Sequence, residues 1–158
     1  MDSSLSCKEL FLDDIVKLEI FPADQCRFPL PANLALSEMS GAVFSEHCLA
    51  IDLTGEADVQ AADVPTLKIS TARSMAGLTY MHDLQVSVQF GAPLVSAAIV
   101  YLKNADFHVV YTKADGTRWL SYSLWNTSLI DFDDTHATAR ACQLKVKLSS
   151  MSDLILLK

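Results

Sequence analysis

Apolar and polar residues alternate along several segments of the chain. From Leu84 to Phe90, every second residue is apolar, without an error in the pattern. The same period of two occurs in residues 16–20, 49–53, 67–70 and 142–148. Alternation of this kind is typical of a β-strand with one buried face. The pattern therefore predicts that each of these segments is a strand packed against a core.

Residues 105–124 predict a β-hairpin that turns at Asp115-Gly116, because a two-residue type I′ turn favours Asp-Gly. One apolar face would pair Lys113 with Arg118, Tyr111 with Leu120, Val109 with Tyr122 and Phe107 with Leu124. The opposite, mostly polar face would pair His108 with Ser123, Val110 with Ser121 and Thr112 with Trp119. A slip by one residue would mix the two sets. The hairpin therefore indicates an antiparallel sheet with one buried face.

Two further segments are apolar without alternation. Residues 94–102 favour a strand covered on both faces over a helix, because their Val, Ile and Tyr residues prefer extended chain. Residues 154–157 predict a short terminal strand. Helical signals are weak, and they predict at most short helices at 33–41 and 71–77.

The spacing of these strands predicts the architecture. Residues 84–148 are typical of an antiparallel meander, and the preceding part supplies further strands. Neither a repeat nor a linker divides the chain, so we expect residues 1–158 to form a single domain. The predicted fold is mainly β: an antiparallel β-sandwich or barrel with at most one or two short helices.

Composition limits the classes of partner. The net charge is −7, which argues against nucleic-acid binding because phosphate neutralisation needs clustered Lys and Arg. Hydrophobic residues make up 51% of the chain, which suggests that apolar surface is buried against other chains in a homo-oligomer. We see neither the basic and apolar regions of a signal peptide nor a membrane-spanning run. The sequence therefore predicts a cytoplasmic or virion protein with protein partners.

Four cysteines bear on the redox compartment. Cys7, Cys26, Cys48 and Cys142 are far apart and have no Cys-x-x-Cys spacing. This arrangement favours reduced thiols over disulfides.

The acidic segment 131–136 is the strongest candidate for a metal site. Asp131, Asp133 and Asp134 offer hard oxygen ligands for Ca²⁺ or Mg²⁺, and His136 suits a transition metal. The segment lies between two predicted strands and lacks the glycine and distal Glu of a calcium-binding helix–loop–helix. We therefore favour a solvated loop without a cofactor, and keep a metal-dependent enzyme as an alternative.

Three histidines adjoin residues with catalytic potential. His47 and Cys48 are neighbours on a predicted strand, so their side chains should point to opposite faces. His82 precedes a strand and favours a turn, and His108 with Ser123 favours a solvent-facing cross-strand pair. Motifs of phosphate-binding loops, nucleophile elbows and zinc proteases do not occur. The sequence therefore predicts a protein that is not an enzyme.

Aromatic residues near the hairpin are candidates for contact. Trp119 lies on the polar face of the predicted hairpin, where it either anchors an interface or is covered by a second sheet or loop. Trp119 and Trp125 together could form an aromatic platform for a small molecule or glycan, which is a second alternative function. The tip of the hairpin adds four candidate contact residues: Lys113, Asp115, Gly116 and Arg118. Two further candidate contact elements are the loop 55–65 and the terminal strand, which we expect to be an open sheet edge.

The C-terminal half combines a strand, the turn Lys113-Ala-Asp-Gly116, a strand ending near Trp125, an acidic loop and the strand Cys142–Leu148. Through this pattern, residues 83–158 resemble small β-structured tail and neck proteins of tailed phages and prophages. The resemblance implies a hairpin and strands that build a ring with neighbouring subunits, and no catalytic residues. We expect a structural or assembly protein that associates with itself or a partner through β-edges and the hairpin.

Overall fold

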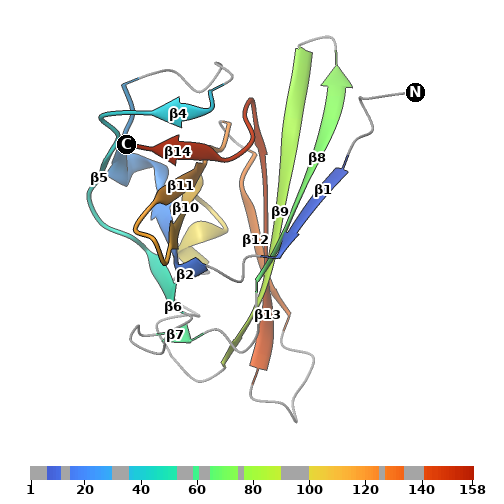
Figure 1. Ribbon diagram of the computed structural model, residues 1–158. Coiled ribbons are helices and arrows are strands. Elements are labelled where there is room, and N and C mark those ends of the chain that lie inside the picture. The colour runs from blue at the N-terminus through green and yellow to red at the C-terminus, as the bar shows by residue number, and fades with distance from the viewer. Residues whose placement is uncertain are drawn as a thin grey trace.

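The computed structural model describes residues 7–11, 15–29, 36–52, 59–60, 65–74, 77–89, 100–124, 127–133 and 141–158. It has the mainly β, sandwich-like architecture that the sequence predicts, with two large sheets that face each other and do not close into a barrel (Figure 1). Residues 100–102 are helical, and Ala23–Gln25 form the short 3-10 helix η2. Within the described residues, no helix is long and apolar enough to cross a membrane.

The first sheet has five antiparallel strands. Their order is β1 (Cys7–Phe11), β8 (Thr66–Ser74), β9 (Gly77–Gln89), β13 (Ala141–Ser150) and β12 (Leu129–Asp133). Leu84 and Val86 are buried and Gln85 is exposed, which confirms the predicted alternation. The same holds for Leu144, Val146 and Leu148 on the neighbouring strand.

The second sheet has seven strands. Their order is β4 (Glu38–Met39), β14 (Ile155–Leu157), β11 (Arg118–Ser121), β10 (Phe107–Lys113), β2 (Ile15–Pro22), β6 (Leu49–Asp52) and β7 (Val59–Gln60). The β14–β4 and β6–β7 pairs are parallel, and the other pairs are antiparallel. The short strands β3 (Cys26–Arg27) and β5 (Val43–Phe44) form a separate two-stranded sheet.

Apolar side chains cover both faces of the seven-stranded sheet. Phe107, Val109 and Tyr111 belong to the main core between the sheets. Val110 belongs to a second cluster, which Phe28, Phe44 and Tyr122 partly cover, with further buried members Phe21, Met39, Leu120 and Ile155. All five residues from Phe107 to Tyr111 are consequently buried. The prediction of a sheet with only one buried face is wrong for this hairpin.

The hairpin register differs by one residue from the predicted one. Lys113 accepts a hydrogen bond from Gly116 N and donates its own N–H to Thr117 O, both at 2.9 Å. The loop therefore has three residues and needs the left-handed conformation at Gly116 (φ 89°), as in a type I turn followed by a bulge. Tyr111 pairs with Trp119 and Val109 with Ser121, so the two predicted faces are mixed. Because both faces of the hairpin are buried, the shifted register does not expose the apolar side chains to solvent.

Three other expectations are wrong. Residues 84–148 do not form one meander, because β10 and β11 lie in one sheet and β9, β12 and β13 in the other. The terminal strand β14 is not an edge, because it lies between β11 and β4. Residues 100–102 are helical instead of extended, and the rest of the run 94–102 lies outside the described residues.

The two predicted short helices are not found where the structure describes them. Glu38–Met39 is strand β4, and β8 continues to Ser74. Both segments pair with neighbouring strands, and this pairing satisfies backbone groups that a helix would have satisfied internally.

Candidate functional site

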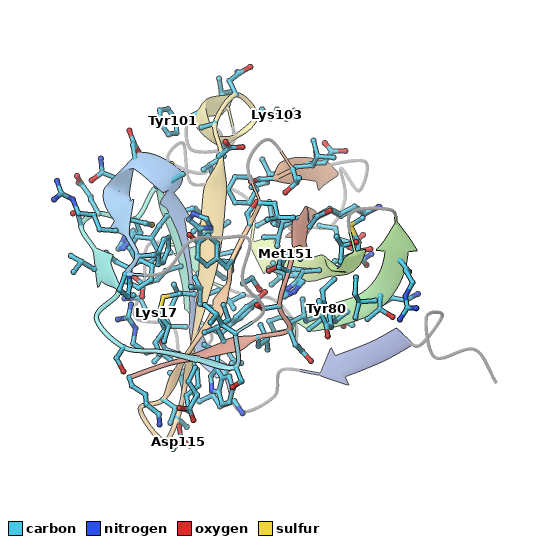
Figure 2. The ribbon with its side chains drawn as sticks, turned by 90° about the horizontal axis from the view of Figure 1, so that it is seen from above. Lys17, Tyr80, Tyr101, Lys103, Asp115 and Met151 are labelled. Atoms are coloured by element: carbon cyan, nitrogen blue, oxygen red, sulfur yellow. The ribbon has the colours of Figure 1, made fainter. Side chains whose placement is uncertain are left out.

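The predicted contact residues at the hairpin tip form an ordered loop. Asp115 Oδ1 accepts hydrogen bonds from Thr117 N at 2.9 Å and from Thr117 Oγ1 at 2.6 Å. The side-chain bond from Thr117 is the main reason why the pKa of Asp115 is lowered. Asp115 and Gly116 are exposed, and Figure 2 shows Asp115 at the opposite end of the view from Tyr101 and Lys103. The tip therefore offers a fixed backbone to solvent.

Trp119 is partly covered by the rest of the fold, which is one of the two environments that the sequence allowed. It lies on the core side of the hairpin with Tyr111, is half-buried, and packs against the main core. Its Nε1–H donates to Thr117 Oγ1 at 3.2 Å, and Lys113 Nζ lies 5.2 Å from its ring centroid. Both the Nε1–H and one face of the Trp119 indole are therefore in contact with other residues of the hairpin. Trp125 lies outside the described residues.

Arg118 points to the other face of the hairpin. Its guanidinium carbon lies 5.3 Å from the centroid of the Phe44 ring. Phe44 also contacts Phe21 and Phe28, at centroid distances of 4.9 and 5.7 Å. Arg118 is half-exposed, so its contact with Phe44 joins the hairpin to the segment that covers the second cluster.

The predicted solvent-facing pair of His108 and Ser123 is wrong. His108 is 5% exposed and packs edge-on against Phe28 and Tyr122, at centroid distances of 5.0 and 4.9 Å. Burial lowers the pKa of His108 to about 4. Its Nδ1 accepts the backbone N–H of Ser123, while the Ser123 hydroxyl lies 2.8 Å from Ser128 Oγ. The imidazole therefore does not activate the Ser123 hydroxyl.

His82 is another polar residue that our sequence analysis placed wrongly. It lies inside β9, not in a turn, and is 2% exposed between the two sheets. Its Nδ1 is 3.0 Å from Ser121 Oγ on β11, and its Nε2 is 2.8 Å from the carbonyl oxygen of Ser152. The alternation of Leu84 and Val86 contained the missing signal, because one more step of two toward the N-terminus puts His82 on the core face.

When the His82 ring is neutral, the donor and the acceptor of each of its hydrogen bonds can be assigned. A carbonyl oxygen only accepts, so Nε2 carries the hydrogen that is donated to Ser152. The Nδ1 atom of a neutral ring then accepts, and the Ser121 hydroxyl donates to it. These buried hydrogen bonds link β9 to β11 and to the turn after β13.

His47 and Cys48 have separate environments, as the sequence predicts. His47 Nδ1 lies 3.0 Å from Glu19 Oε2, and Lys17 Nζ lies 3.8 Å from the same carboxylate oxygen. Cys48 packs against the main core. Burial raises the pKa of the Cys48 thiol above its usual value. A Cys-His nucleophile pair is therefore not formed here.

The acidic segment is only partly described. Asp131 is exposed on β12 opposite Lys145, and Asp133 ends the strand opposite Gln143. Asp134 and His136 lie outside the described residues, as does most of the loop 55–65, of which Val59–Gln60 form β7. Where the structure is described, no three His, Cys, Asp or Glu side chains gather in a way that could hold a metal. The metal-dependent enzyme stays an untested alternative.

The β8–β9 hairpin extends as a two-stranded ribbon beyond its sheet (Figure 1). Strand β1 pairs with β8 only from residue 66 to residue 70, and the pairing of β13 with β9 begins at Tyr80. Residues 72–74 pair with residues 77–79, and neither set pairs with another strand in the described part of the chain. Ala72 and Arg73 are exposed, while Leu78 and Thr79 are half-exposed. We call the described residues of this extension, 72–74 and 77–79, the ribbon.

Comparison with known proteins yields no match: no protein-family model, no curated protein and no solved structure matches this chain.

Proposed function

We propose that this protein is a non-enzymatic assembly subunit that binds copies of itself, or a partner subunit, by strand pairing at the ribbon. The observation that carries the proposal is the extension of β8 and β9 beyond the flanking strands, as far as the structure describes them. A two-stranded hairpin is marginally stable alone in water, and its outer N–H and C=O groups form a template for a further strand. Pairing with another chain would satisfy those groups and bury the ribbon.

The side chains of the ribbon fit a protein partner. Arg73 lies opposite Leu78, and Ala72 lies opposite Thr79. These side chains are a mixture of small, apolar and positively charged groups, as is common at the rim of an interface. Proteins usually protect edges with charges, prolines or covering loops. Among the described residues of the ribbon, Arg73 is the one charged side chain, so charge gives these residues little protection against pairing.

The specific form of the proposal is a ring- or tube-forming component of a phage tail or neck. The pattern-level resemblance of residues 83–158 to such proteins supports this form, and so does the apolar composition. We do not adopt the aromatic-platform alternative, because the hairpin itself engages the Trp119 ring and its Nε1–H.

The test is the mass in solution over a concentration series, measured by light scattering, with negative-stain images of the same fractions. The monomer has a mass of 17.3 kDa, and we expect larger species whose share rises with concentration. In a trimmed variant, Asn-Gly replaces residues 72–79 and joins Thr71 to Tyr80, which pair in the native hairpin. We expect this variant to remain a monomer with an unchanged circular dichroism spectrum.

A side-chain variant is the matched control. Arg73→Ala with Leu78→Ala retains the ribbon backbone, so strand pairing should survive with an affinity close to that of the wild type. Wild-type protein that is monomeric at every concentration would exclude self-association. Assembly that persists in the trimmed variant would place the interface elsewhere.

A further inference from the structure

The hairpin tip contains a peptide bond that can rearrange without an enzyme. In an Asp-Gly sequence, the backbone nitrogen of the glycine can attack the side-chain carboxyl carbon of the aspartate. Glycine permits this attack readily, because it has no Cβ to crowd the approach. Asp115-Gly116 is the only such pair in the chain, and both residues are exposed. Asp115 lies at the periphery of the molecule, where water reaches it (Figure 2).

We propose that Asp115 is a site of spontaneous isomerisation to isoaspartate, and that the Thr117 side chain keeps this reaction slow in the folded protein. In the first step, a bond forms between Gly116 N and Asp115 Cγ. The amide gives up its proton and the carboxyl its hydroxyl, so one water leaves and a cyclic imide remains. In the second step, one water opens the imide. Opening at one carbonyl restores aspartate, and opening at the other carries the main chain through the Asp115 side chain.

The backbone of the turn holds the two reacting atoms apart. Gly116 N donates to Lys113 O at 2.9 Å, which places Asp115 at the third position of a type I turn. The angle ψ at this position is about 0°. Because the imide ring is nearly planar, its closure requires a large rotation about the bond between the Asp115 Cα and its carbonyl carbon. This rotation moves Gly116 N away from Lys113 O, so the turn must open before the ring closes.

Thr117 holds the other reacting group, which is the carboxyl of Asp115. Asp115 Oδ1 accepts hydrogen bonds from Thr117 N at 2.9 Å and from Thr117 Oγ1 at 2.6 Å. Such bonds are stronger to a carboxylate than to a neutral acid, and the side-chain bond is the largest cause of the lowered pKa of Asp115. A carboxylate resists attack by a nitrogen, because it has no hydroxyl to lose as water. Thr117 therefore fixes the carboxyl in position and favours its less reactive form.

The hydroxyl of Thr117 is itself oriented by the hairpin. It accepts the Nε1–H of Trp119 at 3.2 Å, while its own hydrogen is donated to Asp115. The carbonyl oxygen of Thr117 also accepts Lys113 N–H at 2.9 Å. Thr117 is thus a positioning residue of the tip. Loss of its hydroxyl should release the Asp115 side chain and leave the backbone hydrogen bonds of the loop in place.

Peptide mapping of the whole chain tests the proposal. Trypsin cleaves after Lys113 and Arg118, so the fragment 114–118 contains Asp115-Gly116 and no other acidic residue. Its aspartate and isoaspartate forms have equal mass and separate by reversed-phase chromatography. After incubation in H₂¹⁸O and digestion in ordinary water, the isomerised fragment should carry one heavy oxygen, because water opens the imide. Native protein should accumulate isoaspartate several-fold more slowly than the same protein in urea. Equal rates, or no isoaspartate in urea, would overturn the proposal.

Two substitutions of Thr117 form a matched pair. Thr117→Val keeps the shape of the side chain without its hydroxyl, and should form isoaspartate several-fold faster than the wild type. Thr117→Ser keeps a hydroxyl and should restore a rate close to that of the wild type, which a merely structural role of the methyl group would not do. Thr79→Val removes a hydroxyl from the ribbon and should leave the rate at Asp115 unchanged.

A wild-type rate in Thr117→Val, with an unchanged circular dichroism spectrum, would overturn the role of Thr117. If Thr117→Val does not fold, a Thr117→Ser rate as high as that of the wild type in urea would overturn it instead.

Discussion

Tyr111 lies directly opposite Trp119 in the hairpin of β10 and β11, and both face the interior of the sandwich. This pairing places Ser121 on the same face, two residues further along β11, within hydrogen-bonding distance of His82. A two-residue turn would have sent Ser121 to the other side of the sheet. The length of one loop thus determines which polar group meets the buried histidine.

Replacement of Gly116 by Ala should destabilise the hairpin. Gly116 has a φ of +89°, and an added Cβ would meet no atom within 4 Å, so the cost comes from the backbone conformation alone. We expect a loss of about 1 kcal/mol in the free energy of unfolding, measured by urea denaturation. Gly116→Asn should lose less, because Asn tolerates positive φ better. Equal stability of Gly116→Ala and the wild type would contradict the three-residue loop.

Ser121→Ala should destabilise the protein at neutral pH. The substitution leaves His82 Nδ1 without its hydrogen-bond donor inside the sandwich. We expect a loss of about 1–3 kcal/mol from the midpoint and slope of a urea transition at pH 7.5. Ser87→Ala, at a half-exposed position of β9 on the other face, should change stability by under ~0.5 kcal/mol. Similar effects of the two substitutions would argue against the buried network.

His108 should make the stability of the protein fall in mild acid. Its pKa is about 4 in the folded protein and near 6.5 when unfolded, so the unfolded state binds the proton first as the pH falls. The contribution is complete above pH 6.5 and is lost between pH 6.5 and 4, up to roughly 3 kcal/mol at 1.36 kcal/mol per pKa unit. Urea transitions between pH 7.5 and 4.5 should fall less steeply for His108→Gln than for the wild type. An identical slope would show that His108 is not buried in its neutral form.

The thiol of Cys26 should be unreactive in the native protein. Burial, and secondarily the charge of Asp24, raise its pKa to about 12, so almost no thiolate exists at pH 8. In a variant with Cys7, Cys48 and Cys142 replaced by Ser, a chromogenic disulfide reagent should react slowly with native protein. Reaction should become rapid in urea, where the pKa returns to its ordinary value. Rapid reaction without urea would place Cys26 in solvent.

The sequence by itself determined the strands and their buried faces. Residues such as Leu84, Val86, Leu144 and Val146 are buried as their alternation predicts, because period two reflects the local pleat of a strand. The same pattern, continued by one step, would also have placed His82 in the interior.

Only the tertiary structure decided how these strands are divided between the two sheets and which of them form an edge. Alternation shows that a strand has a buried face but not which strand lies beside it, so β10 and β14 could not be placed from their own residues. The hairpin register depended on Phe28 and Phe44, which come from a distant segment and cover the outer face of Val110 and Leu120. Because that cover buries both faces, the apolar residues of the hairpin carry no local preference for one register, and His108 becomes a core residue instead of a surface one.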